Sequence, residues 1–216
     1  MKPSDRRQLL GQLTWRHATK QYDPTRRISA ADWATLEEAL VLSPSSLGLQ
    51  PWAFLVVDAP KVRAQLLLAS YGQPQIVDAS HLVVFATKWS LNGSDVDAHV
   101  RRTAEVRGIP VDAIAGLRRA AMRSVVEGMN DTERRIWAGN QTHLALGNLL
   151  TSAALLGIDA TPIEGIEKCR YDDLLGLRPR GFATVAVAAL GYRATGDNYA
   201  STSELRFARE QVVEHV

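Results

Sequence analysis

The fold of this chain depends most on one segment, Asp131–Leu156, with the sequence DTERRIWAGNQTHLALGNLLTSAALL. Gly157 follows it directly. The segment is long enough for a helix of about seven turns, which we expect to be capped by Asp131 and closed by Gly157. Small and apolar residues cover more than one stripe of that helix. A helix that is apolar on most sides is buried, so this one is expected in the core or at a subunit interface.

Shorter elements surround this helix on both sides in the sequence. We expect helices over 5–14, with Ser4 as the N-cap and Leu9, Leu10 and Leu13 on one face, over 30–40, capped by Ser29, and over 60–69. Apolar runs over 53–57, 82–86 and 182–190 predict buried strands, and 158–165 is expected to be a loop. The stretch 94–128 is predicted to be helical with breaks at Gly108 and Pro110. No internal repeat or linker divides the sequence, so 1–216 is expected to form a single domain.

Composition excludes several classes of protein. The chain has 216 residues, and its 25 Lys and Arg nearly balance its 23 Asp and Glu, so bulk charge does not favour nucleic-acid binding. Cys169 is the single cysteine, which excludes an internal disulfide and a cysteine-based zinc site, and it is expected to be a small, partly buried residue. No apolar run approaches the roughly 20 residues of a membrane span, and the N-terminus has no apolar signal core. We therefore expect a cytoplasmic enzyme or binding protein without a membrane partner.

The common catalytic and phosphate-binding motifs are missing from the sequence. There is no Gly-x-Gly-x-x-Gly after a strand, no phosphate loop ending in Lys-Ser/Thr and no Gly-x-Ser-x-Gly elbow. The five histidines lack zinc-enzyme spacing, and His81 and His143 are expected to be hydrogen-bonded core or interface residues. We predict no catalytic side chain and no metal, and expect the chemistry to come from an organic cofactor.

Four polar clusters in predicted loops could hold such a cofactor. They are Arg16-His17 with Lys20, Pro44-Ser45-Ser46 with Gln50, Pro162-Ile163-Glu164-Gly165, and Arg206. Arginine and a nearby histidine suit a phosphate monoester, whereas serine hydroxyls and backbone amides beside glycine suit a polyol or the edge of a heteroaromatic ring.

Five stretches, in this order, resemble the nitroreductase family of oxidoreductases that depend on flavin mononucleotide (FMN). They are RHATKQYD (16–23), SPSSLGLQPW (43–52), DASH (78–81), GNLL (147–150) and LGIDATPIEG (156–165). The resemblance is to the branch of oxygen-insensitive NAD(P)H nitroreductases and dihydropteridine reductases. It implies an α+β fold in which helices wrap a central, mostly antiparallel mixed sheet, built as an intertwined homodimer. Two FMN molecules would lie at the subunit interface, and a C-terminal extension would reach across to the partner.

The resemblance also implies which residues hold FMN. Arg16 and Arg206 would grip its phosphate with His17 nearby, and Lys20 would lie at the N1–C2=O edge of the flavin ring, where a cation stabilises the reduced form. The full set of implied cofactor contacts is Arg16, His17, Ala18, Lys20, Pro44, Ser45, Ser46, Gly48, Gln73, Gln75, Pro162, Ile163, Glu164, Gly165 and Arg206. Within it, Pro44, Ser45, Ser46 and Gly48 would come from the other subunit, Pro162–Gly165 would pass the ring face and N5, and Gln73 or Gln75 would supply an amide to the pyrimidine edge.

Three positions depart from the family pattern. Ala18 replaces a serine or threonine and removes one hydroxyl from the phosphate or ribityl contacts. Gly48 replaces an asparagine, so a side-chain contact to the ring is lost. Glu204 stands where the branch commonly has lysine, and because a carboxylate repels phosphate we expect this side chain to point away.

The activity that the resemblance implies is a ping-pong reaction. NADH or NADPH would deliver hydride to flavin N5 and leave, and a nitroaromatic, quinone or pteridine would then take two electrons at the same face. A flavin reductase or reductive dehalogenase of the same family remains an alternative, and so does an FMN-binding protein without turnover. The stretch Arg118–Arg123 could grip the amino-acid substrate of a dehalogenase, or simply be the surface of a helix.

Overall fold

A four-stranded antiparallel sheet forms the centre of the computed structural model, which describes residues 6–202 and 205–216. The strands are β1 (Trp52–Val56), β2 (His81–Lys88), β3 (Asp159–Ile163) and β4 (Phe182–Gly191), in the spatial order β1-β2-β4-β3. Each adjacent pair is antiparallel within the described part of the chain. The predicted α+β architecture is therefore confirmed.

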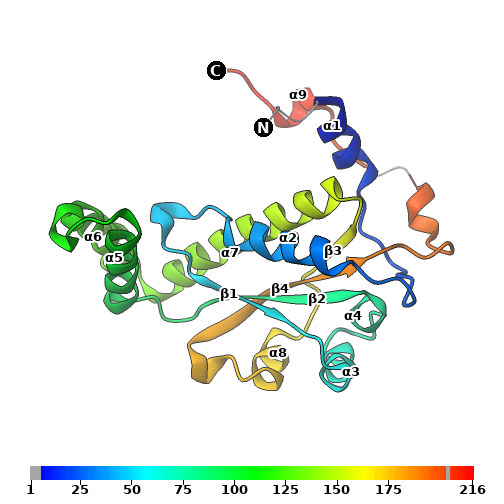
Figure 1. Cartoon of the computed structure of the whole chain (residues 1–216), viewed down its shortest axis with the longest axis horizontal. Coiled ribbons are helices and arrows are strands. Elements are labelled where there is room, and N and C mark those ends of the chain that lie inside the picture. The colour runs from blue at the N-terminus through cyan, green and yellow to red at the C-terminus, as the bar shows by residue number, and fades with distance from the viewer. Residues whose placement is uncertain (1–5, 203–204) are drawn as a thin grey trace.

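Helices cover both faces of this sheet (Figure 1). The helices are α1 (Arg6–Trp15), α2 (Ala30–Val41), α3 (Pro60–Leu68), α4 (Gln75–Asp78), α5 (Gly93–Arg107), α6 (Ala115–Ala121), α7 (Asp131–Leu155), α8 (Lys168–Leu174) and α9 (Arg209–Val212). Short helical turns are η1 (Ser46–Gly48), η2 (Val111–Ile114), the π-helical η3 (Met122–Val126), η4 (Arg178–Arg180) and η5 (Asn198–Ser201). In Figure 1, α2 and α7 lie on one face of the sheet, and α3, α4 and α8 lie on the other, whereas α1 and α9 project beyond the sheet.

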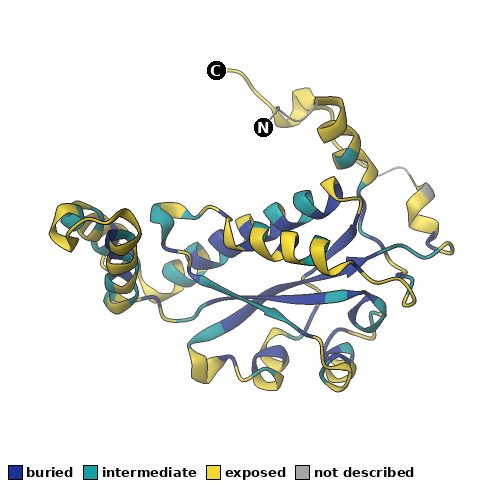
Figure 2. Ribbon diagram, viewed as in Figure 1, coloured by how far each residue is buried: buried dark blue, intermediate teal, exposed yellow. Residues whose placement is uncertain are grey.

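The core fills both sides of the sheet because alternate residues of a strand point to opposite faces. On β2, Val83 and Phe85 join the cluster under α2 and α7, and Leu82 and Val84 join the cluster over α3 and α8. Figure 2 shows the two central strands buried and the outer surfaces of the helices exposed. The sheet is thus a rigid frame whose ends position the polar segments.

The N-cap of the long helix α7 lies one residue earlier than the sequence predicts. Its N-cap is Asn130 rather than Asp131, because the Asn130 side chain accepts hydrogen bonds from the N–H groups of Thr132 and Glu133. In return, the Glu133 carboxylate accepts a hydrogen bond from the Asn130 N–H. The predicted stop is confirmed, since Gly157 follows the last turn with a φ of +69°.

The predictions for the two edge strands need correction. Residues 158–165, expected to be a loop, contain β3, which pairs with β4. Pro162 is tolerated there because β3 is an edge strand, so a missing N–H breaks no central ladder. The strand β1, expected to be buried, is half-buried along its whole length because it forms the opposite edge.

One single-residue prediction is also wrong. Cys169 is exposed, because the inward side of α8 is formed by Tyr171 and Asp172. His143 is hydrogen-bonded, as expected of a core or interface histidine, but its side chain is 41% exposed on the surface of α7, so of the two alternatives only the interface stays open.

The helical stretch between β2 and α7 agrees with its prediction. The helix α5 ends at Gly108, which adopts a left-handed conformation, and Pro110 precedes the next turn. Leu49 packs with Val96, Val100 and Ala121 in a separate small cluster. Among the described residues, no helix is both long and apolar enough to cross a membrane.

Candidate functional site

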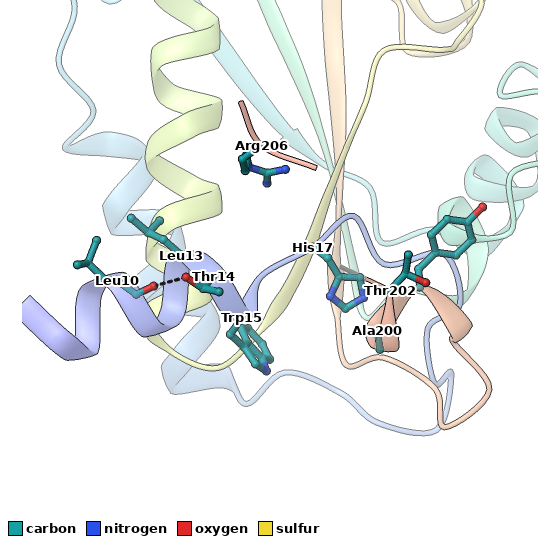
Figure 3. Close-up of a pocket in the computed structure, with 9 residues that line it drawn as sticks. Leu10, Leu13, Thr14, Trp15, His17, Ala200, Thr202 and Arg206 are labelled. Carbon is teal, nitrogen blue, oxygen red and sulfur yellow. Dashed lines mark hydrogen bonds between the residues drawn. The ribbon is translucent and has the colours of Figure 1, made fainter. Parts of the chain in front are cut away.

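A cavity of about 470 Å³ lies where α1 meets the C-terminal segments. It is lined by Leu10, Leu13, Thr14 and Trp15 of α1, by His17, and by Tyr199, Ala200, Thr202 and Arg206. Figure 3 shows that these side chains come from three separate stretches of the chain. The structure therefore brings His17 and Arg206, two residues predicted to act together, to one cavity.

The basic segment Arg16–Lys20 is held in place by Asp197. The buried His17 has its Nε2 atom 3.4 Å from Asp197 Oδ2, and the Lys20 N–H donates to the same oxygen at 3.2 Å. The Lys20 ammonium is exposed, 5.8 Å from the Tyr199 ring centroid. Arg16 is half-buried, and its Nε has no hydrogen-bond partner within the described residues. The segment thus presents cationic groups from a fixed backbone.

Buried hydrogen bonds tie this segment to β3. Thr161 Oγ1 donates to the Thr19 carbonyl at 2.8 Å, and Thr19 Oγ1 donates to Asp159 at 3.2 Å. Asp159 also pairs with Arg193 at 2.5 Å. Tyr22 donates to the Ala189 carbonyl and lies 3.0 Å from Thr161, and burial raises the pKa of its phenol. The predicted Arg16–Lys20 and Pro162–Gly165 groups therefore share β3 as a support.

The end of β3 leads into the exposed pair Glu164 and Gly165. Gln73 donates from Nε2 to the Gly165 carbonyl at 2.8 Å, so one of the two predicted glutamines does lie against this segment. Gln75 is buried in α4, and its Oε1 has no partner among the described residues. Glu164 pairs with His143 of α7 at 3.3 Å. Pro162 is half-buried and Ile163 is in the core, where it fixes the strand.

The serine loop, residues 43–48, is attached to α7 by buried or half-buried amides. The Ser46 N–H donates to Gln141 Oε1 at 2.9 Å, and Asn148 Nδ2 donates to Ser43 Oγ at 3.1 Å. Pro44 and Ser46 are exposed, and Ser45 is half-buried.

Gly48 has a structural reason to replace asparagine. Its φ is +69°, and a Cβ would lie 3.2 Å from the ring of His99 on α5. The small residue therefore admits α5 against the loop. Burial lowers the pKa of His99. Of the other departures, Ala18 is half-buried, and Glu204 lies outside the described residues.

Within one copy of the chain, the predicted FMN contacts fall into two separate groups. Gln141, which holds the serine loop, and His143, which holds Glu164, are two residues apart on α7. Because a helix turns about 100° per residue, these side chains leave α7 in directions about 200° apart. The serine loop and the end of β3 thus contact opposite sides of the same helix.

Sequence reasoning missed the residues that hold these groups. Asp197 lies in the C-terminal part that appears simply polar, and Thr161 lies in the stretch interpreted as a loop. Gln141 carried a usable signal, since a polar residue on the apolar side of a buried helix usually has a specific partner.

The nitroreductase family model matches residues 13–192, which include the Arg16–Lys20 segment, the serine loop and all four strands. The chain belongs to the nitroreductase family. A Staphylococcus epidermidis relative, provisionally named an NAD(P)H nitroreductase, is 38% identical over 187 residues, covering 83% of this chain and 85% of the relative.

Solved structures of low identity show the same nitroreductase fold. A nitroreductase-like protein of Streptococcus mutans has a TM-score of 0.83 at 18% identity, covering 96% of this chain and 97% of that one. A nitroreductase structure from Exiguobacterium sibiricum, described as a complex with FMN, has a TM-score of 0.79 at 20% identity, covering 100% and 99% of the two chains.

Proposed function

We propose that this protein is an FMN-dependent NAD(P)H oxidoreductase of the nitroreductase type, with nitroaromatics, quinones or pteridines as electron acceptors. Family membership, the name of the Staphylococcus relative and the FMN of the Exiguobacterium structure support the proposal. The observation that carries it in this chain is the meeting of His17, from the Arg16–Lys20 segment, with Arg206 in the lining of one cavity.

The residues around this cavity fit a phosphorylated flavin. Arg16 Nε is a buried donor with no partner in the described residues, and Arg16 is the sequence neighbour of Trp15 and His17, which both line the cavity. An unsatisfied buried donor is costly, and a phosphate oxygen would satisfy it with a charge-assisted bond. Arg206 lines the cavity itself and supplies a cation there.

The residues of the chain would bind and orient this cofactor. Arg16, His17 and Arg206 would hold its phosphate, while the Lys20 cation would favour negative charge on the reduced ring. Gly165 offers a backbone that a planar ring can approach, since a Cβ there would meet only the Gln73 amide, at 3.9 Å. FMN, when bound, supplies two-electron hydride chemistry, so these side chains need to donate no proton at N5.

A complete site would require a second copy of the chain. The serine loop and the end of β3 contact opposite sides of α7, so a partner would have to bring its own serine loop to Glu164 and Gly165. The exposed leucines of α1, including Leu10 at 63%, and Leu144 of α7 at 53% offer apolar surface for such contact. We therefore propose a homodimer in which each FMN lies between subunits.

Anaerobic titration of the purified protein tests this function. NADH or NADPH should bleach a bound flavin, and a nitroaromatic, added without oxygen, should restore its colour. Comparing nitroaromatic, quinone, pteridine, free-flavin and halogenated acceptors would separate nitroreductase from the flavin reductase and dehalogenase alternatives. A protein that binds FMN but is bleached by neither nucleotide would be a binding module, and a colourless protein that refuses FMN would contradict the proposal.

A further inference from the structure

A second polar cavity, of about 360 Å³, lies at the start of β2, and its lining contains none of the predicted FMN contacts. It is lined by Arg27, Asp58, Arg63, Ser80 and His81. Every one of these side chains is polar or charged, which is typical of a site for a charged ligand.

Two guanidinium groups converge on the same two carbonyl oxygens in this cavity. Arg63 Nη1 donates to the Ala79 carbonyl at 2.7 Å, and Arg27 Nη1 donates to the Ser80 carbonyl at 2.8 Å. Each also reaches the other's acceptor at a longer distance, 3.4 Å for Arg27 and 3.5 Å for Arg63. Two positive charges are therefore held side by side by the turn that precedes β2.

These two charges are poorly neutralised by the protein. Neither arginine forms an ion pair with a carboxylate within the residues that the structure describes, and Asp58 is the one acidic residue in the lining. Arg63 is only 6% exposed, and burial, followed by the charge of Arg27, lowers its pKa. The cavity keeps an excess of one positive charge even when Asp58 is counted in full.

Unused donors point to the same kind of ligand. The described hydrogen bonds of Arg27 all come from Nη1, so its Nε and Nη2 groups stay available. Ser80 Oγ accepts from the Ile28 N–H and lies 3.0 Å from His81 Nδ1, so the hydroxyl is held against the imidazole ring. The other ring nitrogen of His81, Nε2, has no hydrogen-bond partner among the described residues.

The His81 ring is also fixed in position. It stacks on Trp33 of α2 with ring centroids 3.9 Å apart and an interplanar angle of 13°. Burial lowers the pKa of His81. The stacking thus sets the direction of the ring nitrogens before any ligand arrives.

We propose that Arg27, Arg63 and His81 form a binding site for a phosphate group, separate from the proposed FMN site. Arg27 offers its unused Nε and Nη2 groups, whereas Arg63 donates to the Val57 and Ala79 carbonyls and contributes mainly its charge. The three side chains come from the loop before α2, from α3 and from β2, so a ligand with several acceptor oxygens can contact all of them. A carboxylate offers only two such oxygens. The ligand chemistry is therefore a phosphate monoester or inorganic phosphate, held by charge-assisted bonds.

The experiment uses the full-length protein loaded with FMN, so that its proposed phosphate grip at Arg16 and Arg206 is occupied. Thermal unfolding is followed as inorganic phosphate replaces chloride at constant ionic strength, with acetate as the planar comparison. We expect a saturable rise in Tm with phosphate and at least tenfold weaker binding in Arg27→Gln. Arg26→Gln is the matched control, because it removes the same charge from the neighbouring residue. The Arg26 side chain stacks on Tyr192 and does not line this cavity.

Three outcomes would overturn the proposal. Phosphate could give no saturable shift, acetate could bind as tightly as phosphate, or Arg26→Gln could weaken binding as much as Arg27→Gln. FMN content and reduction by NADH should be unchanged in Arg27→Gln, so loss of this site is distinguishable from failure of the proposed function. If the protein binds no FMN, Arg16→Gln and Arg27→Gln separate the two possible phosphate sites.

Discussion

The two sides of α7 have similar sequences but different surroundings. On the inner side, Ala145 and Leu149 are fully buried against the sheet. On the outer side, Ile136 and Leu144 are 60% and 53% exposed although they are as apolar as the inner residues. The inner side is explained by the fold of one chain, whereas the outer side is explained by the proposed second copy. Because both sides are apolar in sequence, the pattern alone does not separate a side buried within the chain from a side open to a second chain.

The largest expected effect is on the inner side. Leu149→Asp places a carboxylate among residues with no exposed surface, at a cost of about 5 kcal/mol or more, which is comparable with the whole stability of a small domain. We expect the variant to fail to fold. Far-UV circular dichroism and soluble yield would check this, and a folded Leu149→Asp protein would show that the inner side is less tightly packed than the structure indicates.

The same kind of substitution on the outer side of α7 should leave the fold intact and prevent formation of the proposed dimer. Leu144→Asp is expected to lower dimer stability by about 3–6 kcal/mol, since each of two leucines is worth about 1.5–3 kcal/mol when buried. Light scattering coupled to size-exclusion chromatography should find a folded monomer without FMN. A Leu144→Asp dimer that retains FMN would place the interface elsewhere.

A substitution in the Arg16–Lys20 segment is expected to have a smaller effect, limited to FMN affinity. Arg16→Gln should weaken FMN binding by about 1.5–3 kcal/mol, because a charge-assisted phosphate contact is lost from a group with no described alternative partner. Fluorescence titration of the apoprotein with FMN measures this. Arg170→Gln, a charge loss on the exposed surface of α8, is the control and should bind FMN like the unaltered chain. Equal affinities for all three proteins would remove Arg16 from the site.

The smallest effect is expected where the outer side of α7 meets β3. Glu164→Gln removes the 3.3 Å contact with His143, but both side chains are exposed, and such pairs are worth less than about 1 kcal/mol. Urea unfolding in the Leu144→Asp background, in which the partner is expected to be absent, should therefore give a midpoint close to that of Leu144→Asp alone. A loss of several kcal/mol would mean that this pair stabilises the single chain more than its exposure indicates.

Local patterns in the sequence predicted most of the elements and failed where tertiary context overrides them. The stop of α7 at Gly157 and the break at Gly108 follow from left-handed conformations that glycine adopts without strain. In contrast, β3 was missed because Pro162 and the surrounding small polar residues suggest a loop, and only pairing with β4 makes the segment a strand. Cys169 was misplaced because which side of the short helix α8 faces the core is decided by Tyr171 and Asp172.

The residues of the candidate site were likewise predicted only in part from the sequence. The cluster around Arg16 and His17 was visible in the sequence, because cationic residues beside short polar loops suit phosphate. The supporting residues Asp197, Thr161 and Gln141 were not, since each acts on a partner far away in the chain. The FMN contacts as a set stay a prediction that the experiments above address.

The sequence alone determined the longer helices, the strands β1, β2 and β4, the family and the chemical character of the polar clusters. These features depend on spacing, capping and residue type. Only the tertiary structure decided that the serine loop and the end of β3 lie on opposite sides of α7 and that Arg27 and Arg63 share one turn. The physical reason is that these arrangements depend on which residues, distant along the chain, the packed sheet and helices bring into contact.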